Sequence, residues 1–281
     1  MVWPFPHVLG GRLRHPEGMT TLRPVRQRLS ARVRAWITAV LALLSGYVIA
    51  TARQAAVRPP LVLGQDAVPP SGQDSSQVTL ETSGGQVIDI RPSSGEATTL
   101  LILYPGGLVR PQAYEWIGRA LTMHGVQTVI PVFPLDLAVT GINRAGGLIA
   151  QYGQGKRVVI AGHSLGGAMA AQYAAGHTDQ LAGMILMAAY PAGNVTLKGK
   201  TLPTLSLLAE KDGVADPQEV RGGLDRLPDD TTLTVIPGAV HAFFGRYGPQ
   251  KGDGVPTVTH GQAETSILAA ITAFLDKLPA R

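Results

Sequence analysis

One serine in the sequence has neighbours that could make it a catalytic nucleophile. Residues 162–167 read GHSLGG, which places Ser164 in a Gly-x-Ser-x-Gly pattern. The pattern has only three fixed positions, and a chain with 34 glycines can contain it by chance. A serine hydroxyl becomes a good nucleophile at neutral pH only when a base removes its proton. The residues around the pattern, and the other groups that such chemistry needs, must therefore decide its meaning.

The segments on either side of this pattern are those expected around a nucleophile. Residues 156–161 (KRVVIA) predict a buried strand, and residues 165–175 predict an alanine-rich helix. A sharp turn from strand to helix is the setting that presents a serine hydroxyl at the edge of a sheet. Gly162 and Gly166 would remove side chains where strand and helix crowd together. This setting favours a catalytic Ser164 over a chance match.

The acid partner of such a serine should follow it in the chain and come just after a strand. Residues 204–209 predict a strand, and three acidic residues follow it, Glu210, Asp212 and Asp216. The side chain of Glu210 should point elsewhere because it adjoins the strand. Asp216 precedes Pro217 and is typical of a helix N-cap. We therefore assign the acid to Asp212, with Asp216 as the alternative.

The base should be a histidine that comes later still, after another strand. His241 lies in PGAVHAFFG, directly after a strand predicted over residues 231–236. His163 adjoins the serine, and neighbouring side chains on a sharp turn diverge. His260, in a polar loop before the last helix, is the main rival to His241. The remaining candidates end predicted helices, where a cation is favourable: His124 and His177.

Carbonyl chemistry also needs donors that face the developing negative charge on oxygen. The backbone N–H of Leu165, directly after the serine, is one candidate. The second should come from the loop after the strand predicted over residues 98–104, which continues PGGL. Glycine lets the backbone approach a substrate closely. We predict the N–H of Gly107 as the second donor, with Leu108 as the alternative.

The predicted serine, acid, histidine and backbone donors can meet only in a fold that brings the carboxyl ends of several strands together at one edge of a sheet. After residue 77, short β-rich runs alternate with helix-length segments, which predicts an α/β fold with a mostly parallel twisted sheet and helices on both faces. In such sheets the reactive groups lie in loops at the carboxyl ends of the strands. Strands are expected at 78–82, 86–91, 98–104, 126–133, 156–161, 182–188, 204–209 and 231–236, and helices at 112–124, 141–152, 165–175, 217–227 and 262–278.

The first part of the chain predicts an export signal. Residues 1–34 form a basic region, and residues 35–52 are an uncharged apolar run that five arginines precede. Such a basic flank favours export of the rest of the chain. A helix of this length rises about 27 Å, at the border between a signal peptide and a transmembrane anchor. Small residues at 50–52 predict a cleavage site after Ala52.

The segments after this run predict the remaining domain organisation. Residues 53–77, rich in Pro, Gln and Ser, form a linker, and residues 78–281 form the catalytic domain. The protein would be secreted if the run is cleaved. If it is retained, residues 35–52 would anchor the domain in a membrane, facing outside the cytoplasm. Translation from Met19 would shorten the basic region to the usual size for a signal.

Composition excludes several other functions. Residues 1–58 hold nine Arg and one Glu, a net charge of +8, so the other residues of this +5 chain sum to −3. The basic character belongs to residues 1–58, and we expect no surface that binds nucleic acid on the rest of the chain. The chain has no cysteine, which removes disulfides and thiolate sites. No metal-binding or nucleotide-binding motif is present, so we expect no metal and no cofactor.

At these residues the chain resembles the α/β-hydrolase superfamily, over roughly residues 78–281. It looks most like the small lidless members near the dienelactone-hydrolase-like branch, through LILYPGGLV, AGHSLGGAMAAQYA, LAEKDGVAD and HAFFGRYGPQKGDG. The resemblance implies Ser164 as nucleophile, Asp212 as acid and His241 as base. True dienelactone hydrolases have cysteine where Ser164 stands, so their substrate does not carry over. About fifteen residues separate the strands at 182–188 and 204–209, too few for a helical cap, so we expect an open site.

We therefore expect a serine hydrolase that cleaves a small-molecule ester through an acyl-enzyme on Ser164. Two other functions remain open at this point. The same three residues could transfer an acyl group to a cell-envelope alcohol, and water exclusion would decide between the two reactions. The chain could also be a non-catalytic binding module on a hydrolase fold, because a fold alone does not prove an activity.

Overall fold

The computed structural model describes residues 30–55 and 76–279. Contacts within the chain divide it into two units, Met1–Ala55 and Ala56–Arg281. Nearly all of the predicted basic region (1–34) and linker (53–77) lies outside the described residues.

The first unit contains one described helix, α1 (Ala31–Ala55), which includes the predicted apolar run at 35–52. Its large apolar side chains, such as Trp36, Leu43 and Ile49, are exposed. Among the described residues, no helix combines the length and the hydropathy needed to cross a membrane. The anchor and the cleavable signal both stay predictions.

The second unit is built on an eight-stranded sheet with strand order β1-β2-β4-β3-β5-β6-β7-β8. Strands β1 and β2 form an antiparallel hairpin, and β2 also pairs antiparallel with β4, whereas all other neighbours are parallel. The mostly parallel sheet predicted from the sequence is confirmed. The strands are β1 (Ser76–Glu81), β2 (Val87–Pro92), β3 (Thr99–Tyr104), β4 (Val126–Pro131), β5 (Arg157–His163), β6 (Gly183–Met187), β7 (Thr204–Ala209) and β8 (Thr232–Ile236).

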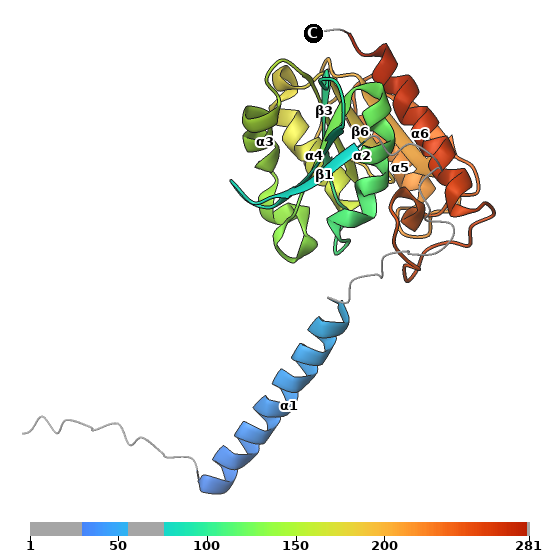
Figure 1. Ribbon diagram of the computed structural model, residues 1–281. Helices are drawn as coiled ribbons and strands as arrows, with labels where there is room; N and C mark the ends of the chain where they lie inside the picture. Colours follow the sequence, from blue (N-terminus) through green and yellow to red (C-terminus); the bar gives the residue numbers. More distant parts are fainter. Residues whose placement is uncertain (1–29, 56–75, 280–281) are drawn as a thin grey trace, which may run out of the picture. The chain divides into compact units, whose positions relative to one another are not determined.

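Helices cover both faces of this sheet (Figure 1). On one face, apolar side chains of α2 and α6 share a core with Leu101 and Leu103 of β3, and on the other those of α3 and α4 share a core with Leu100 and Ile102. Every residue of β3 is buried because alternate side chains enter the two cores. The helices are α2 (Glu115–Leu121), α3 (Arg144–Tyr152), α4 (Leu165–Gly176), α5 (Pro217–Gly223) and α6 (His260–Lys277).

Several predicted helices are shorter in the structure and continue as 3₁₀ turns. The helix predicted over 112–124 consists of α2 with a 3₁₀ turn before it and another after it. In the second turn, the hydroxyl of Thr122 donates a hydrogen bond to the carbonyl of Arg119. Tighter turns of this kind are common at helix ends. The 3₁₀ turns are η2 (Pro111–Tyr114), η3 (Thr122–His124), η4 (Pro134–Asp136), η5 (Ala138–Gly141), η6 (Thr178–Gln180), η7 (Leu224–Arg226) and η8 (His241–Phe244).

Candidate active site

Ser164 occupies the sharp turn between β5 and α4. Its φ of 53° and ψ of −125° lie in a region that residues with a side chain rarely adopt. A backbone held there costs about 1–3 kcal/mol and is found mainly at functional sites. Ser164 itself is half-buried. The structure thus gives this serine the sharp strand–helix turn that the sequence predicts.

Three glycines make this turn possible because no Cβ would fit at their positions. A Cβ on Gly162 would lie 2.4 Å from the carbonyl oxygen of Gly166. A Cβ on Gly166 would lie 2.2 Å from the oxygen of Pro105, and one on Gly167 would lie 2.4 Å from Cβ of Ala189. Strand, turn and helix therefore pack backbone against backbone.

Asp212 and His241 form a buried pair in the loops after β7 and β8. The Nδ1 atom of His241 lies 2.8 Å from Oδ2 of Asp212, and both side chains are at most 1% exposed. The other carboxylate oxygen accepts hydrogen bonds from the backbone N–H groups of Val214 (2.8 Å) and Ala215 (2.7 Å). An ionised carboxylate only accepts, so Nδ1 carries the proton and Nε2 is left to accept one.

The imidazole of His241 lies close to the turn that carries Ser164. The imidazole of His163, the residue before Ser164, contacts the imidazole of His241 with ring centroids 4.5 Å apart. Among the hydrogen bonds of the described residues, the His241 ring bonds to Asp212, and none joins it to the Ser164 hydroxyl. Hydrogen bonds of this type are often long in ligand-free enzymes and tighten when substrate binds.

The loop after β3 contributes one unoccupied backbone donor. The N–H of Leu108 donates to the carbonyl of Asp136 at 2.8 Å, and the N–H of Gly106 donates to the Tyr114 hydroxyl at 3.0 Å. In the part of the chain that the structure describes, the N–H groups of Gly107 and Leu165 have no acceptor. The predicted alternative Leu108 is therefore engaged elsewhere, which leaves Gly107 and Leu165.

Comparison with known proteins identifies the family. A family model described as the alpha/beta hydrolase family matches residues 100–265, more than half of the chain. This chain belongs to the alpha/beta hydrolase family. The fold resembles the solved structure of a predicted CIB-like hydrolase from Thermoplasma acidophilum, with a TM-score of 0.53 and 16% identity over 72% of this chain and 99% of that one. The comparison with curated protein sequences found no match to this chain.

The alternative acids of this hydrolase have other partners. Asp216 is the N-cap of α5 and accepts a hydrogen bond from the backbone N–H of Gln218 at 2.7 Å. Glu210 accepts from the N–H of Gly238 at 2.8 Å, and this hydrogen bond, together with Lys211, lowers the pKa of the Glu210 carboxyl. Among the described residues, neither carboxylate has a hydrogen bond or ion pair with a histidine.

The rival histidine also belongs to another part of the hydrolase fold. His260 begins α6, and its ring stacks on Phe243 with centroids 4.6 Å apart and planes 7° apart. Its Nε2 lies 4.0 Å from Oε1 of Glu264, which itself binds Arg246. His260 therefore packs α6 against the turn that contains His241.

His163, the residue before Ser164, is buried and makes a hydrogen bond with Tyr114. The Tyr114 hydroxyl lies 2.8 Å from Nδ1 of His163. The hydroxyl accepts from the N–H of Gly106, and its own proton is satisfied in this buried position when it is donated to Nδ1 of a neutral His163 ring. Burial, and then the neighbouring His241, holds the pKa of His163 well below its ordinary value, so this ring is neutral. Tyr114 was missed in the sequence because 49 positions separate it from His163.

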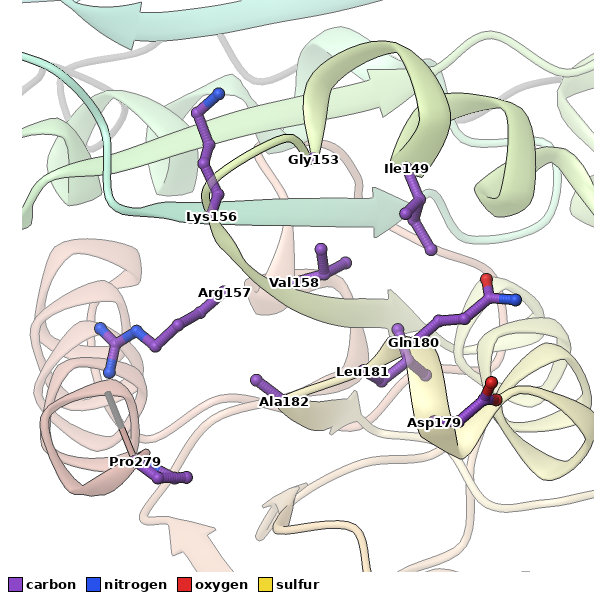
Figure 2. A pocket seen from close by; sticks show the side chains of 10 residues that line it. All are labelled: Ile149, Gly153, Lys156, Arg157, Val158, Asp179, Gln180, Leu181, Ala182 and Pro279. Atoms are coloured by element: carbon purple, nitrogen blue, oxygen red, sulfur yellow. The ribbon is translucent and has the colours of Figure 1, made fainter. Parts of the chain in front are cut away.

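A separate hollow of about 450 Å³ lies at the opposite edge of the sheet (Figure 2). Its lining includes Arg157 at the amino end of β5, whereas Ser164 follows the carboxyl end of that strand. Arg157 donates to the carbonyl of Leu278 and to the hydroxyl of Thr99, so its charge secures α6 to the sheet. Among the described residues, no group of three or more acidic, His or Cys side chains could hold a metal.

Proposed function

We propose that this protein is a serine hydrolase that cleaves a carboxylic ester through an acyl-enzyme on Ser164. The observation that carries the proposal is the buried Asp212–His241 hydrogen bond beside the strained turn of Ser164. A histidine held by a buried carboxylate, next to a serine on a strand–helix turn, is the arrangement that activates a hydroxyl.

In the proposed reaction, Nε2 of His241 takes the proton of Ser164 while Oγ forms a bond to the carbonyl carbon. Asp212 holds the imidazole in its tautomer and stabilises the imidazolium that forms. The oxyanion accepts hydrogen bonds from the N–H groups of Gly107 and Leu165, and each such donor lowers the barrier by about 3 kcal/mol. The alkoxide then leaves with the proton from His241, and water releases the acid by the same steps.

The surroundings of these donors favour a substrate with an apolar acyl group. A Cβ on Gly107 would lie 3.1 Å from Cδ2 of Leu165 and 3.7 Å from Cδ2 of Leu137, so both leucines flank the donor. Apolar side chains around a few polar groups are typical of small-molecule sites.

Covalent labelling tests this function. We expect a fluorophosphonate to label the purified full-length protein on Ser164, and Ser164→Ala to lose the label. The labelled protein should lose its hydrolysis of p-nitrophenyl esters, tested over graded acyl lengths. Absence of label on folded protein, or labelling that persists in Ser164→Ala, would overturn the proposal.

We also propose that residues 35–52 direct export, either as a signal that is cleaved after Ala52 or as a retained membrane anchor. The support is the uncharged run that follows five arginines and the exposed apolar side chains of α1. Fractionation of cells, followed by N-terminal sequencing of the exported protein, tests this. A mature chain that starts at Arg53 supports the proposal, and full-length protein confined to the cytoplasm contradicts it.

A further inference from the structure

The loop that precedes α6 contains a carboxylate with an unusual set of partners. The side chain of Asp253 accepts four backbone hydrogen bonds, and no other side chain takes part in them. Its Oδ1 accepts from the N–H groups of Gly213 (3.2 Å), His241 (3.0 Å) and Gly254 (2.8 Å), and its Oδ2 accepts from that of Ala242 (2.9 Å).

Three of these four donors belong to the two loops that hold the candidate acid and base. Gly213 directly follows Asp212, and the other two donors are His241 itself and Ala242 after it. The single oxygen Oδ1 therefore binds both loops at once. The side chain of Asp212 stays available to His241 because Asp253 uses only main-chain donors.

Two of these three loops also touch through their backbones. A Cβ on Gly254 would lie 1.8 Å from the carbonyl oxygen of Lys211, and a Cβ on Gly213 would lie 2.4 Å from that of Gly252. Glycine at these positions lets the segment 252–254 press directly on the segment 211–213. Any displacement of Asp253 is therefore passed to the backbone beside Asp212.

We propose that Asp253 is a positioning residue that sets the geometry of the Asp212–His241 pair. A carboxylate offers several acceptor sites, and hydrogen bonds to an ionised acceptor are stronger than neutral ones. Four such bonds fix the two loops relative to each other, and hence the distance from Nδ1 of His241 to Oδ2 of Asp212. This inference rests on the proposed function, because it assigns Asp253 a part in that reaction.

A positioning role predicts a change in kcat rather than in KM. Asp253 touches neither the candidate nucleophile nor the predicted oxyanion donors, so substrate binding should change little. A misplacement of about 1 Å in a catalytic group can cost about 100-fold in rate. Loss of stability alone would lower the amount of folded enzyme and leave the kcat of each labelled site unchanged.

The test compares Asp253→Asn, Asp253→Ala and a control in the full-length chain. Asn keeps one acceptor oxygen but places an NH₂ group opposite a backbone N–H, whereas Ala removes all four bonds. We expect kcat per fluorophosphonate-titrated site to fall about 10-fold in Asp253→Asn and about 100-fold in Asp253→Ala. KM for a p-nitrophenyl ester should stay within about twofold in both variants. Neither substitution removes a contact that binds the substrate equally in the ground state and in the transition state.

Asp216→Ala is the matched control, because it also removes a carboxylate that accepts a backbone N–H near Asp212. It should keep the wild-type kcat. Wild-type kcat in folded Asp253→Asn, or an equal loss in Asp216→Ala, would overturn the positioning role while Ser164 labelling still stands. Failure of the wild-type protein to label would overturn the proposed function and this role with it. If Asp253→Ala does not fold, Asp253→Asn decides.

Discussion

The Nδ1 atom of His241 lies 2.8 Å from Oδ2 of Asp212, although 29 positions separate the two residues in the chain. They meet because β7 and β8 are parallel neighbours and both residues follow the carboxyl end of their strand. A further backbone bond, from the N–H of Lys211 to the carbonyl of Ala239, continues this pairing into the two loops. The pair is buried, so substitutions within it should affect turnover strongly.

Asp212→Asn should lower kcat by about 10⁴-fold, because an amide favours the wrong imidazole tautomer. Asp216→Ala should keep the wild-type kcat and lose about 1 kcal/mol of stability through the lost N-cap of α5. Steady-state kinetics and urea unfolding of both variants check this. Equal kinetic losses would mean that Asp212 is not the acid.

His241→Gln should lower kcat by about 10³- to 10⁴-fold, because no general base remains. His260→Gln should retain turnover and lose about 1 kcal/mol through the lost stacking on Phe243. Kinetics on one ester, with thermal melting of each variant, separate the two histidines. The assignment of the base is wrong if His260→Gln is the inactive variant.

Ser164→Gly should be inactive and more stable than the wild-type protein. Glycine adopts the positive φ of this turn without strain, so we expect a gain of about 1 kcal/mol in the free energy of unfolding. Ser164→Ala keeps the strain and should show no such gain. Chemical denaturation of the three proteins measures the difference, and an equal stability for Gly and Ala would argue against strain at this residue.

Tyr114→Phe should lower both stability and turnover. It leaves the N–H of Gly106 and Nδ1 of His163 without a partner in a buried site, at a cost of about 1–3 kcal/mol. Gly106 precedes the predicted donor Gly107, so we expect kcat to fall about 10-fold. The control is Tyr173→Phe, whose hydroxyl binds Gln180 instead. Unchanged kcat in Tyr114→Phe would contradict a link to the oxyanion loop.

Acidification should destabilise the protein through His163. Its folded-state pKa lies well below the ordinary value of 6.5, mainly because the ring is buried. Below pH 6.5 the unfolded chain therefore binds a proton that the folded chain does not, so stability is full above this pH and falls below it. Protonation of His163 can lower the free energy of unfolding by at most about 1.4 kcal/mol for each pH unit of acidification.

Urea unfolding at pH 7.5 and 5.5 measures this effect in the wild-type protein and in His163→Gln. Glutamine can still accept the Tyr114 hydrogen bond but does not titrate. The variant should lose less stability than the wild type between the two pH values. Equal losses would show that other groups account for the pH dependence.

The sequence predicts the order of strands and helices because each buried strand and each helix carries its own local pattern. β3 is recognised from its unbroken apolar run, and the turn of Ser164 from the glycines that surround it. Element ends are less well predicted: the helix expected at 112–124 is partly 3₁₀, because packing on β2 and β4 decides where it begins and ends.

The sequence by itself therefore determined the nucleophile's turn, the α/β order and the candidates Asp212, His241 and Gly107. These features depend on short stretches of chain, whose chemistry is visible in their own residues. Only the tertiary structure decided that Leu108 is engaged by Asp136 and that Asp253 joins the loops beside Asp212 and His241. Such contacts depend on which strand ends the sheet brings together, and no local pattern carries that information.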